Sequence, residues 1–222
     1  MADDNRYKYV FSEPVSYANI GITEYTLTQL DFTRLNVPWV VSRGSSLATA
    51  PDEVSINTIS GYTNDHNNGD LVGSAEQSFI ELMNADILVP GNKYFSTTPC
   101  FRNEVEEDEF HLPYFMKTEL FAFFETSVEA HACLKDFIEV ADGIMKGLIP
   151  SFTGVDENLK PSIVPIHKSE YHHGITIQVD IHINHIEVGS YGVRKIGEDC
   201  YVVFGTGIAE PRFSQAVKVN IP

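Results

Sequence analysis

Apolar side chains that recur every three or four positions predict three helices, in residues 20–35, 74–83 and 127–148. The third helix has the clearest pattern. Its apolar face is predicted to be Leu134, Phe137, Ile138, Ala141, Ile144, Met145 and Leu148. This face should pack on the core.

Capping signals support the two later helices. Ser74 followed by Gln77, and Thr126 followed by Glu129, have the spacing of a capping box. In that motif two side chains bond to backbone N–H groups at the start of a helix. Pro150 has no backbone N–H and predicts the end of the third helix.

Alternating or continuous apolar runs predict strands at residues 37–42, 54–59, 94–102, 115–124, 163–167, 175–188 and 201–204. An acidic turn separates the runs 94–102 and 115–124, which predicts a long antiparallel hairpin. Residues 43–73 are rich in Gly, Ser, Asn and Asp and are predicted to be mostly loop. Antiparallel strands interrupted by helices predict an α+β fold.

Bulk composition narrows the class of protein. The 222 residues suit a single domain, and 43% hydrophobic with 21% charged residues is ordinary for a globular protein. The formal net charge of −16 disfavours general nucleic-acid binding and anionic membrane surfaces. No signal peptide or apolar span is predicted, so we expect a cytoplasmic protein and no membrane partner. The cysteines, Cys100, Cys133 and Cys200, form no disulfide or zinc pattern.

The first candidate site follows the strand that ends near Arg102. A guanidinium group presents a planar fork of donors that suits phosphate. Glu104 lies two residues on, on the same strand face, and could accept a hydrogen bond from an exocyclic amine. Phe115, on the return strand after His111, could stack on a flat base. The alternative interpretation is a surface hairpin with a salt bridge.

The second candidate is the carboxylate pair of Asp180 and Glu187. Counting by twos along a strand places them on opposite faces, but a bulge near Asn184 and His185 would bring them together. Two converging carboxylates are typical Mg²⁺ ligands when phosphates supply the remaining oxygens. The alternative is a pair of solvated charges.

Two glycine-containing stretches complete the candidates. Residues 189–194 and 205–212 are interpreted as turns that end in Arg194 and Arg212. Gly205 and Gly207 would let the backbone approach a ligand closely. Each stretch alone is also compatible with an ordinary loop.

Taken in order, these segments resemble the signature motifs of class II aminoacyl-tRNA synthetases, from about residue 25 to the end. They are most similar to the aspartyl and asparaginyl enzymes and to ammonia-dependent asparagine synthetase. The sequences FRNE at 101–104 and HLPYF at 111–115 resemble the second motif. The resemblance implies that Arg102 holds the α-phosphate, Glu104 the adenine amino group and Phe115 the adenine face. His111 belongs to the same ATP site, and Glu119 would meet the substrate's amino group.

The later segments carry further implied roles. By the resemblance, Asp180 and Glu187 bind Mg²⁺ with ATP, and Arg194 reaches the side chain of an acidic or amide substrate. Arg212 clamps the γ-phosphate, and the family pattern also implies an ATP-site role for Gly205 and Gly207. Gln77 and Ser190 are further implied substrate contacts, and Pro38 would mark the dimer interface. Lys117 stands where the aspartyl enzymes have a Gln, so a new cation would face the substrate pocket.

Several positions depart from the family pattern. Phe110 stands where the synthetases often carry an Arg, and Tyr114 replaces a Glu. Ile80 stands where the aspartyl enzymes keep a Lys. Glu210 and Pro211 alter the third motif. These departures bear on the identity of the amino acid and on the activity.

The resemblance implies one catalytic domain over residues 1–222, with 1–13 a loose lead-in, and a homodimer. Its reaction would be ATP-dependent activation of an amino acid carboxylate, with an aspartate-like substrate favoured and Arg102 and Arg212 as catalytic residues. We expect no anticodon-binding domain, because the length leaves no room for one. Residues 104–109 are strongly acidic and would repel tRNA. The expected acceptor is a small nucleophile such as ammonia or an amine.

Two competing interpretations remain. One is a non-catalytic synthetase paralog that acts as a dimeric nucleotide-binding or amino-acid-binding module. The other is a metal-dependent hydrolase that uses His172, His173, His182 and His185. His182 and His185 point to opposite faces of a strand, so they meet one metal only with a bulge.

Overall fold

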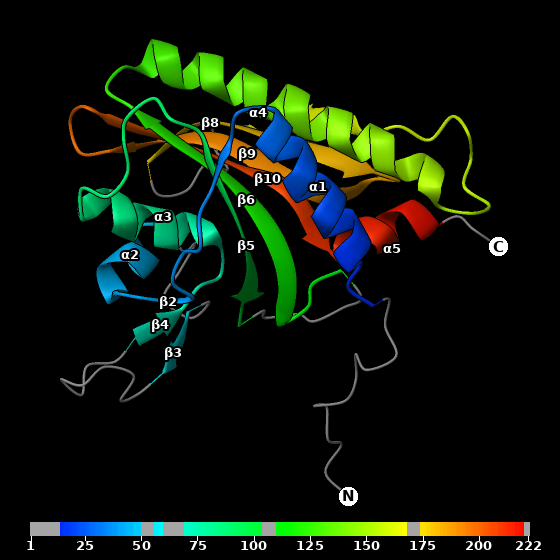
Figure 1. Ribbon diagram of the computed structural model, residues 1–222, viewed down its shortest axis with the longest axis horizontal. Coiled ribbons are helices and arrows are strands. Elements are labelled where there is room, and N and C mark those ends of the chain that lie inside the picture. The colour runs from blue at the N-terminus through cyan, green and yellow to red at the C-terminus, as the bar shows by residue number, and fades with distance from the viewer. Residues whose placement is uncertain (1–13, 50–55, 60–68, 104–109, 168–173, 220–222) are drawn as a thin grey trace, which may run out of the picture.

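A seven-stranded sheet organises the protein (Figure 1). The computed structural model describes residues 14–49, 56–59, 69–103, 110–167 and 174–219. The strand order is β1-β5-β6-β10-β9-β8-β7, antiparallel throughout except for the parallel pair β1 and β5. A second, three-stranded sheet has the order β2-β4-β3. The predicted α+β class is confirmed.

The strands are β1 (Thr33–Arg34), β2 (Val40–Val41), β3 (Asn57–Ile59), β4 (Gly69–Leu71), β5 (Tyr94–Phe101), β6 (Tyr114–Phe124), β7 (Ser162–Pro165), β8 (Ile175–Ile183), β9 (Ile186–Ile196) and β10 (Cys200–Glu210). The helices are α1 (Tyr17–Gln29), α2 (Arg43–Leu47), α3 (Ala75–Asn84), α4 (Ser127–Leu148) and α5 (Arg212–Lys218). Among the described helices, none is both long enough and apolar enough to cross a bilayer.

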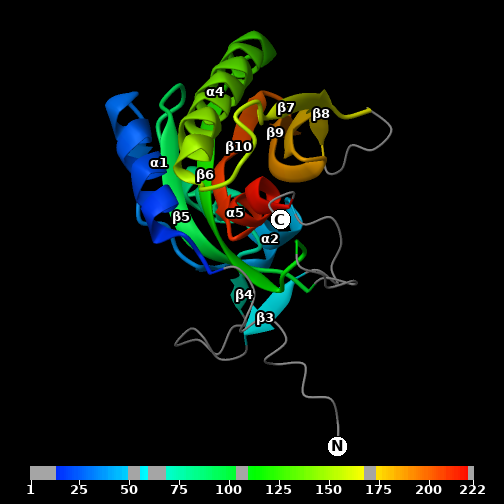
Figure 2. The same cartoon turned by 90° about the vertical axis from the view of Figure 1, so that its right-hand side faces the viewer.

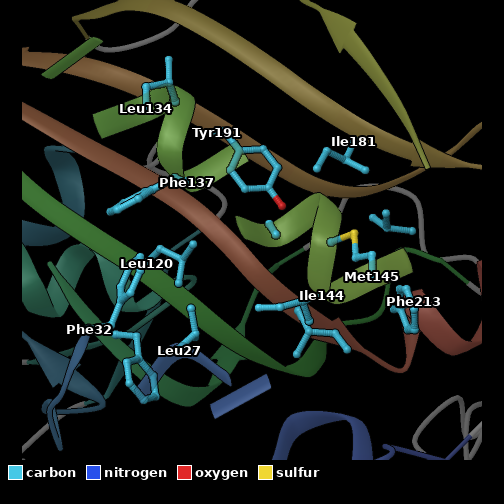
Figure 3. Packing of buried hydrophobic residues seen from close by; sticks show 14 of the residues in the cluster. Leu27, Phe32, Leu120, Leu134, Phe137, Ile144, Met145, Ile181, Tyr191 and Phe213 are labelled. Atoms are coloured by element: carbon cyan, nitrogen blue, oxygen red, sulfur yellow. The ribbon is translucent and has the colours of Figure 1, made fainter. Parts of the chain in front are cut away.

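Helices α1, α4 and α5 cover one face of the large sheet. Their apolar side chains join the sheet in one core, in which Phe137 of α4 lies near Tyr191 and Leu120 (Figure 3). Every member of the predicted apolar face of α4 is buried in this core or packs against it. The cap predicted at Thr126 is also present, because its hydroxyl accepts from the Glu129 N–H.

The opposite face is covered by α3. Phe79 of α3 stacks on Phe121 of β6 with ring centroids 4.9 Å apart. Ser74 caps this helix by accepting from the Glu76 N–H. Figures 1 and 2 both place β3 and β4 at the end of the molecule away from α4. Residues of the large sheet, α3 and the small sheet together line one cavity.

The β8–β9 hairpin corrects one prediction. The alternating run 175–188 was interpreted as one strand with a bulge near Asn184. Asn184 and His185 instead form the turn between two strands, with φ angles of 49° and 67°. Register shifts between β8 and β9 lie instead between Ile175 and Ile177 and between Ile181 and His182. The turn follows from the short polar side chain of Asn184, which tolerates the left-handed region.

The glycine-containing stretches are strands as well, so their prediction as turns was wrong. Residues 189–194 belong to β9 and residues 205–210 to β10. A Cβ on Gly205 would lie 2.6 Å from Cδ1 of Tyr191, on the side that faces α4. A Cβ on Gly207 would lie 3.2 Å from Cγ2 of Thr118. Both glycines allow close packing within the sheet, and Gly205 makes room for Tyr191.

Gly205→Ala is expected to destabilise the protein by about 1–3 kcal/mol, the usual cost of overpacking a core. The Tyr191 ring cannot move away easily, because it is fully buried and its hydroxyl donates to the Thr206 carbonyl at 2.5 Å. Urea unfolding would measure the loss. Gly143→Ala on α4 is the matched control, since its Cβ meets nothing within 4 Å. An unchanged stability of Gly205→Ala would contradict the packing shown here.

Helix α1 differs from its prediction in both bounds. It begins at Tyr17, with Ser16 as its cap, and ends at Gln29. The chain then forms β1, which pairs with β5 at the edge of the sheet. Scattered apolar residues beyond Gln29 had extended the predicted helix by mistake.

Candidate active site

A cavity of about 310 Å³ lies between the sheet and α3, on the face opposite α4. Five residues predicted from the sequence line it together: Gln77, Arg102, Lys117, Glu187 and Ser190. They come from α3, the end of β5, β6 and β9. Residues far apart in the sequence thus converge on one polar cavity.

Arg102 lies directly after the end of β5, where the connection to β6 begins. Its backbone N–H donates to the Pro113 carbonyl at 2.9 Å, which holds the two ends of this connection together. Its side-chain Nε donates to the Gly73 carbonyl at 3.2 Å, and its Cζ lies 5.1 Å from the centre of the Phe115 ring. Phe115, which was expected to stack on a flat base, thus lies beside Arg102. Glu104 lies outside the described residues.

Glu119 is buried next to Lys117 and Ser74, two residues that line the cavity. The Lys117 Nζ lies 2.7 Å from Glu119 Oε2, and the Ser74 hydroxyl donates to the same oxygen. Glu119 is fully buried, and this burial raises the pKa of its carboxyl, while Lys117 opposes the rise. The other oxygen, Oε1, has no hydrogen-bond partner among the described residues. Lys117, which lines the cavity, is therefore paired with a carboxyl group buried next to it.

A second buried ion pair lies behind the cavity wall. Arg194 Nε donates to Glu76 Oε1 at 3.1 Å, and both side chains are less than 10% exposed, at 4% and 7%. The Arg194 Cζ also lies 5.5 Å from the centre of the Phe204 ring. Glu76 lines the cavity, whereas Arg194 is not among its lining residues. Sequence reasoning missed Glu76, whose signal was an acidic residue in the first turn of α3.

Gln77 and Ser190 present uncharged hydrogen-bonding groups. Gln77 Oε1 accepts from the Gly73 N–H at 2.8 Å, and its Nε2 donates to the Ser46 carbonyl at 3.3 Å. Ser190 accepts from Gln178 Nε2 at 3.0 Å. These bonds hold the wall of the cavity in place.

Asp180 and Glu187 lie on one face of the β8–β9 hairpin. Asp180 pairs with Ser190, and His182 pairs with Glu187, so the register shift puts both carboxylates on the cavity side. Asp180 is 6% exposed, and its Oδ1 has no hydrogen-bond partner among the described residues. Burial raises the pKa of Asp180 to about 6, and the nearby Glu187 carboxylate adds to the rise. The predicted convergence is present, although a hairpin turn and a displaced bulge produce it.

Asp180→Asn is expected to stabilise the protein at pH 8 by about 2–3 kcal/mol, since each unit of pKa shift corresponds to ~1.4 kcal/mol. The ordinary pKa of this carboxyl is 3.8, so between that value and about 6 the folded state binds the proton more tightly than the unfolded chain. The stability that Asp180 contributes is present below pH 3.8 and is lost as the pH rises through 6. The advantage of the variant should therefore shrink below pH 6.

Urea unfolding at pH 8, 6 and 5 would measure this effect. Asp199→Asn removes an exposed carboxylate and is the matched control, with an expected change within about 0.5 kcal/mol. A destabilised Asp180→Asn protein at pH 8 would show that the folded structure favours the charged carboxylate.

Arg212 links two sides of the site. Its Nε donates to the Phe110 carbonyl at 2.7 Å, and its Nη1 lies 3.9 Å from Glu187 Oε1. His111, which follows Phe110, is exposed. Arg212 thus stands between the hairpin that carries Arg102 and the strand that carries Glu187.

The described residues contain no group of three or more His, Cys, Asp and Glu side chains able to hold a metal ion. His182 lies on β8 and His185 in the following turn. His172 and His173 lie outside the described residues. The carboxylates of Asp180 and Glu187 are oxygen ligands, which Mg²⁺ prefers.

Comparisons with solved structures place this fold. Seryl-tRNA synthetase from Pyrococcus horikoshii complexed with ATP matches with a TM-score of 0.70 and 18% identity, over 90% of this chain and 48% of that chain. Serine-tRNA ligase from Naegleria fowleri with AMP gives 0.72 and 16%, over 91% and 48%. Prolyl-tRNA synthetase from Giardia lamblia with prolyl-adenylate gives 0.69 and 12%, over 91% and 45%. A scan against family models and a search of curated proteins found no match.

The chain therefore has a fold similar to the catalytic core of class II aminoacyl-tRNA synthetases. It spans about half the length of the structures that it matches. The special similarity to the aspartyl and asparaginyl group stays a prediction from the sequence, since the matched structures are seryl and prolyl enzymes.

Proposed function

We propose that this protein activates the carboxylate of an amino acid with ATP, forming an acyl-adenylate and pyrophosphate. One observation carries the proposal: Arg102 lines the same cavity as Gln77, Lys117, Glu187 and Ser190. The fold is shared with proteins solved with ATP, AMP and prolyl-adenylate. A cavity that holds a phosphate-binding cation beside polar groups suits a reaction between an amino acid and a nucleotide.

In this mechanism a substrate carboxylate oxygen attacks the α-phosphorus, and pyrophosphate leaves. Arg102 would stabilise the negative charge that develops on the α-phosphate oxygens. Phe115, whose ring centre lies 5.1 Å from the Arg102 Cζ, would stack on the adenine. Arg212 would hold the γ-phosphate. Positioning and electrostatics account for the catalysis, and the reaction needs no covalent bond to the protein.

Asp180 and Glu187 would hold Mg²⁺ together with the ATP phosphates. The fit rests on the buried Asp180 Oδ1, which has no hydrogen-bond partner among the described residues, and on the neighbouring Glu187 carboxylate. Bound Mg²⁺ would neutralise phosphate charge. A cation there would also favour the ionised form of Asp180, which burial disfavours.

The amino group of the substrate would meet the carboxylate of Glu119, and Gln77 would contact the rest of the amino acid. The sequence favours an aspartate-like side chain, read by Arg194. In the structure Arg194 already pairs with Glu76. An acidic side chain would therefore have to replace Glu76 as the partner of Arg194. Serine and proline belong in the same substrate screen.

A small nucleophile such as ammonia or an amine would accept the activated acyl group. The acidic sequence of residues 104–109 supports this acceptor over tRNA, because it adds negative charge next to Arg102. Each candidate acceptor would be added to a reaction in which the protein forms the acyl-adenylate. The true acceptor should attack the acyl group and release AMP. AMP release that needs tRNA would contradict this part of the proposal.

We also propose a homodimer. The exposed side of α1 carries the large apolar side chains of Tyr17, Ile22 and Tyr25, and exposed Leu30 follows the end of the helix. Such a surface is typical of a covered interface. Sedimentation equilibrium would show a dimer, and a monomer at micromolar concentration would exclude it.

A non-catalytic paralog is the second candidate. Glu210 and Pro211 favour it, because they replace the ordinary third-motif residues next to Arg212. Such a protein would bind ATP without exchanging pyrophosphate. The two candidates thus differ in one measurable step.

The deciding experiment is amino-acid-dependent exchange of labelled pyrophosphate into ATP, with Mg²⁺ and without tRNA, across all twenty amino acids. Exchange with one amino acid would identify both the activity and the substrate. No exchange, together with ATP binding by calorimetry, would favour the non-catalytic paralog. If the protein neither exchanges pyrophosphate nor binds ATP, both candidates are overturned.

A further inference from the structure

The junction between β10 and α5 determines where Arg212 points. Glu210 is the last residue of β10, and Arg212 is the first of α5. Helix α5 has seven residues, and no side chain caps its start. A helix this short is not stable by itself and takes its direction from tertiary contacts.

The Glu210 carboxylate supplies such contacts. It is fully buried, and its Oε1 accepts from Asn19 Nδ2 at 2.8 Å and from the Ser214 hydroxyl at 3.0 Å. Asn19 Nδ2 also lies 3.4 Å from the Ser214 hydroxyl oxygen. One carboxylate oxygen thus joins α1, β10 and α5, and Figure 1 shows the beginning of α1 beside α5.

We propose that Glu210 is a positioning residue, which fixes α5 against α1 so that Arg212 faces the ATP phosphates. The inference rests on the proposed function, which gives Arg212 a phosphate to hold. It assigns a role to the residue that departs from the family's third motif. Asn19 belongs to the same hydrogen-bond network. Through Asn19, this network connects α1 to the proposed nucleotide site.

The comparison of ATP with AMP tests this role, because AMP lacks the phosphates that Arg212 would reach. Glu210→Leu removes the acceptor at similar volume. It should raise the Kd for ATP at least about tenfold, since small displacements of a binding group are costly. The Kd for AMP should stay within about twofold, because AMP makes no contact that depends on Arg212. Calorimetry would measure both constants.

Two further variants sharpen the result. Glu210→Gln keeps an oxygen that accepts from Asn19 and Ser214, so it should recover most of the lost ATP affinity. Thr26→Ala on the exposed side of α1 is the control and should leave both constants unchanged. If Glu210→Leu fails to fold, the Kd values of Asn19→Ala for ATP and AMP test the inference instead.

If Glu210→Leu or Asn19→Ala raises the Kd for ATP and the Kd for AMP equally, Glu210 has only a structural role and the inference is overturned. The proposed function would still stand. Unchanged ATP binding would overturn it as well. A wild-type protein that binds neither nucleotide would overturn the proposed function, and the inference with it.

Discussion

Arg102→Ala should lower amino-acid-dependent pyrophosphate exchange by about 10²–10³-fold, the usual cost of removing one group that stabilises developing charge. The side chain lines the cavity and contacts the Gly73 carbonyl and the Phe115 ring. It is half-buried at the end of β5, outside both hydrophobic clusters. The variant should therefore fold normally, and its melting temperature should confirm that.

Two arginine variants make this result specific. Arg34→Ala removes an exposed arginine that pairs with Glu24 at 3.1 Å, and it should leave exchange unchanged. Arg102→Lys keeps the charge but loses the planar fork, so its activity should fall between wild type and alanine. Full exchange by Arg102→Ala would remove Arg102 from the mechanism and with it the main support for the adenylate reaction.

The β5–β6 hairpin shows what the sequence can predict. Two apolar runs and an acidic turn between them define the hairpin locally, and Arg102 and Phe115 follow from its ends. The same holds for α4, whose apolar face and Thr126 cap are both local signals. For these two elements, local patterns were sufficient.

Contacts between distant elements were harder to predict. The turn at Asn184 and His185 lacks the glycine that usually marks a hairpin, so β8 and β9 were interpreted as one strand. The glycines of β10 imitate a turn in the sequence, although Gly205 accommodates Tyr191 from the neighbouring strand. In both cases the structure depends on how neighbouring strands pair in the sheet. The local sequence does not specify that pairing.

The ion pair of Glu76 and Arg194 is the strongest example. The two residues are 118 positions apart, and no local pattern relates them. From the resemblance Arg194 was expected to read the substrate's side chain. The structure places it in a buried ion pair with Glu76, and Arg194 itself does not line the cavity.

Arg194→Met should therefore lower the free energy of unfolding by about 3–5 kcal/mol, because it leaves the Glu76 carboxylate buried without its partner. Both side chains lie out of water, at 4% and 7% exposure, so solvent cannot replace the lost interaction. Urea unfolding at pH 7 would measure the change. The Arg34→Ala protein is the surface control, with an expected loss of at most about 1 kcal/mol.

The double variant Glu76→Leu with Arg194→Met separates a structural pair from a substrate-binding arginine. Replacing a whole buried ion pair by apolar side chains is often close to neutral, so the double variant should regain most of the stability that Arg194→Met loses. An arginine that also binds substrate would have a second effect: Arg194→Met would raise the KM for an acidic amino acid. Stability and KM are separate measurements, so the KM of Arg194→Met tests the aspartate-like substrate, and an unchanged KM would exclude Arg194 as the residue that binds its side chain.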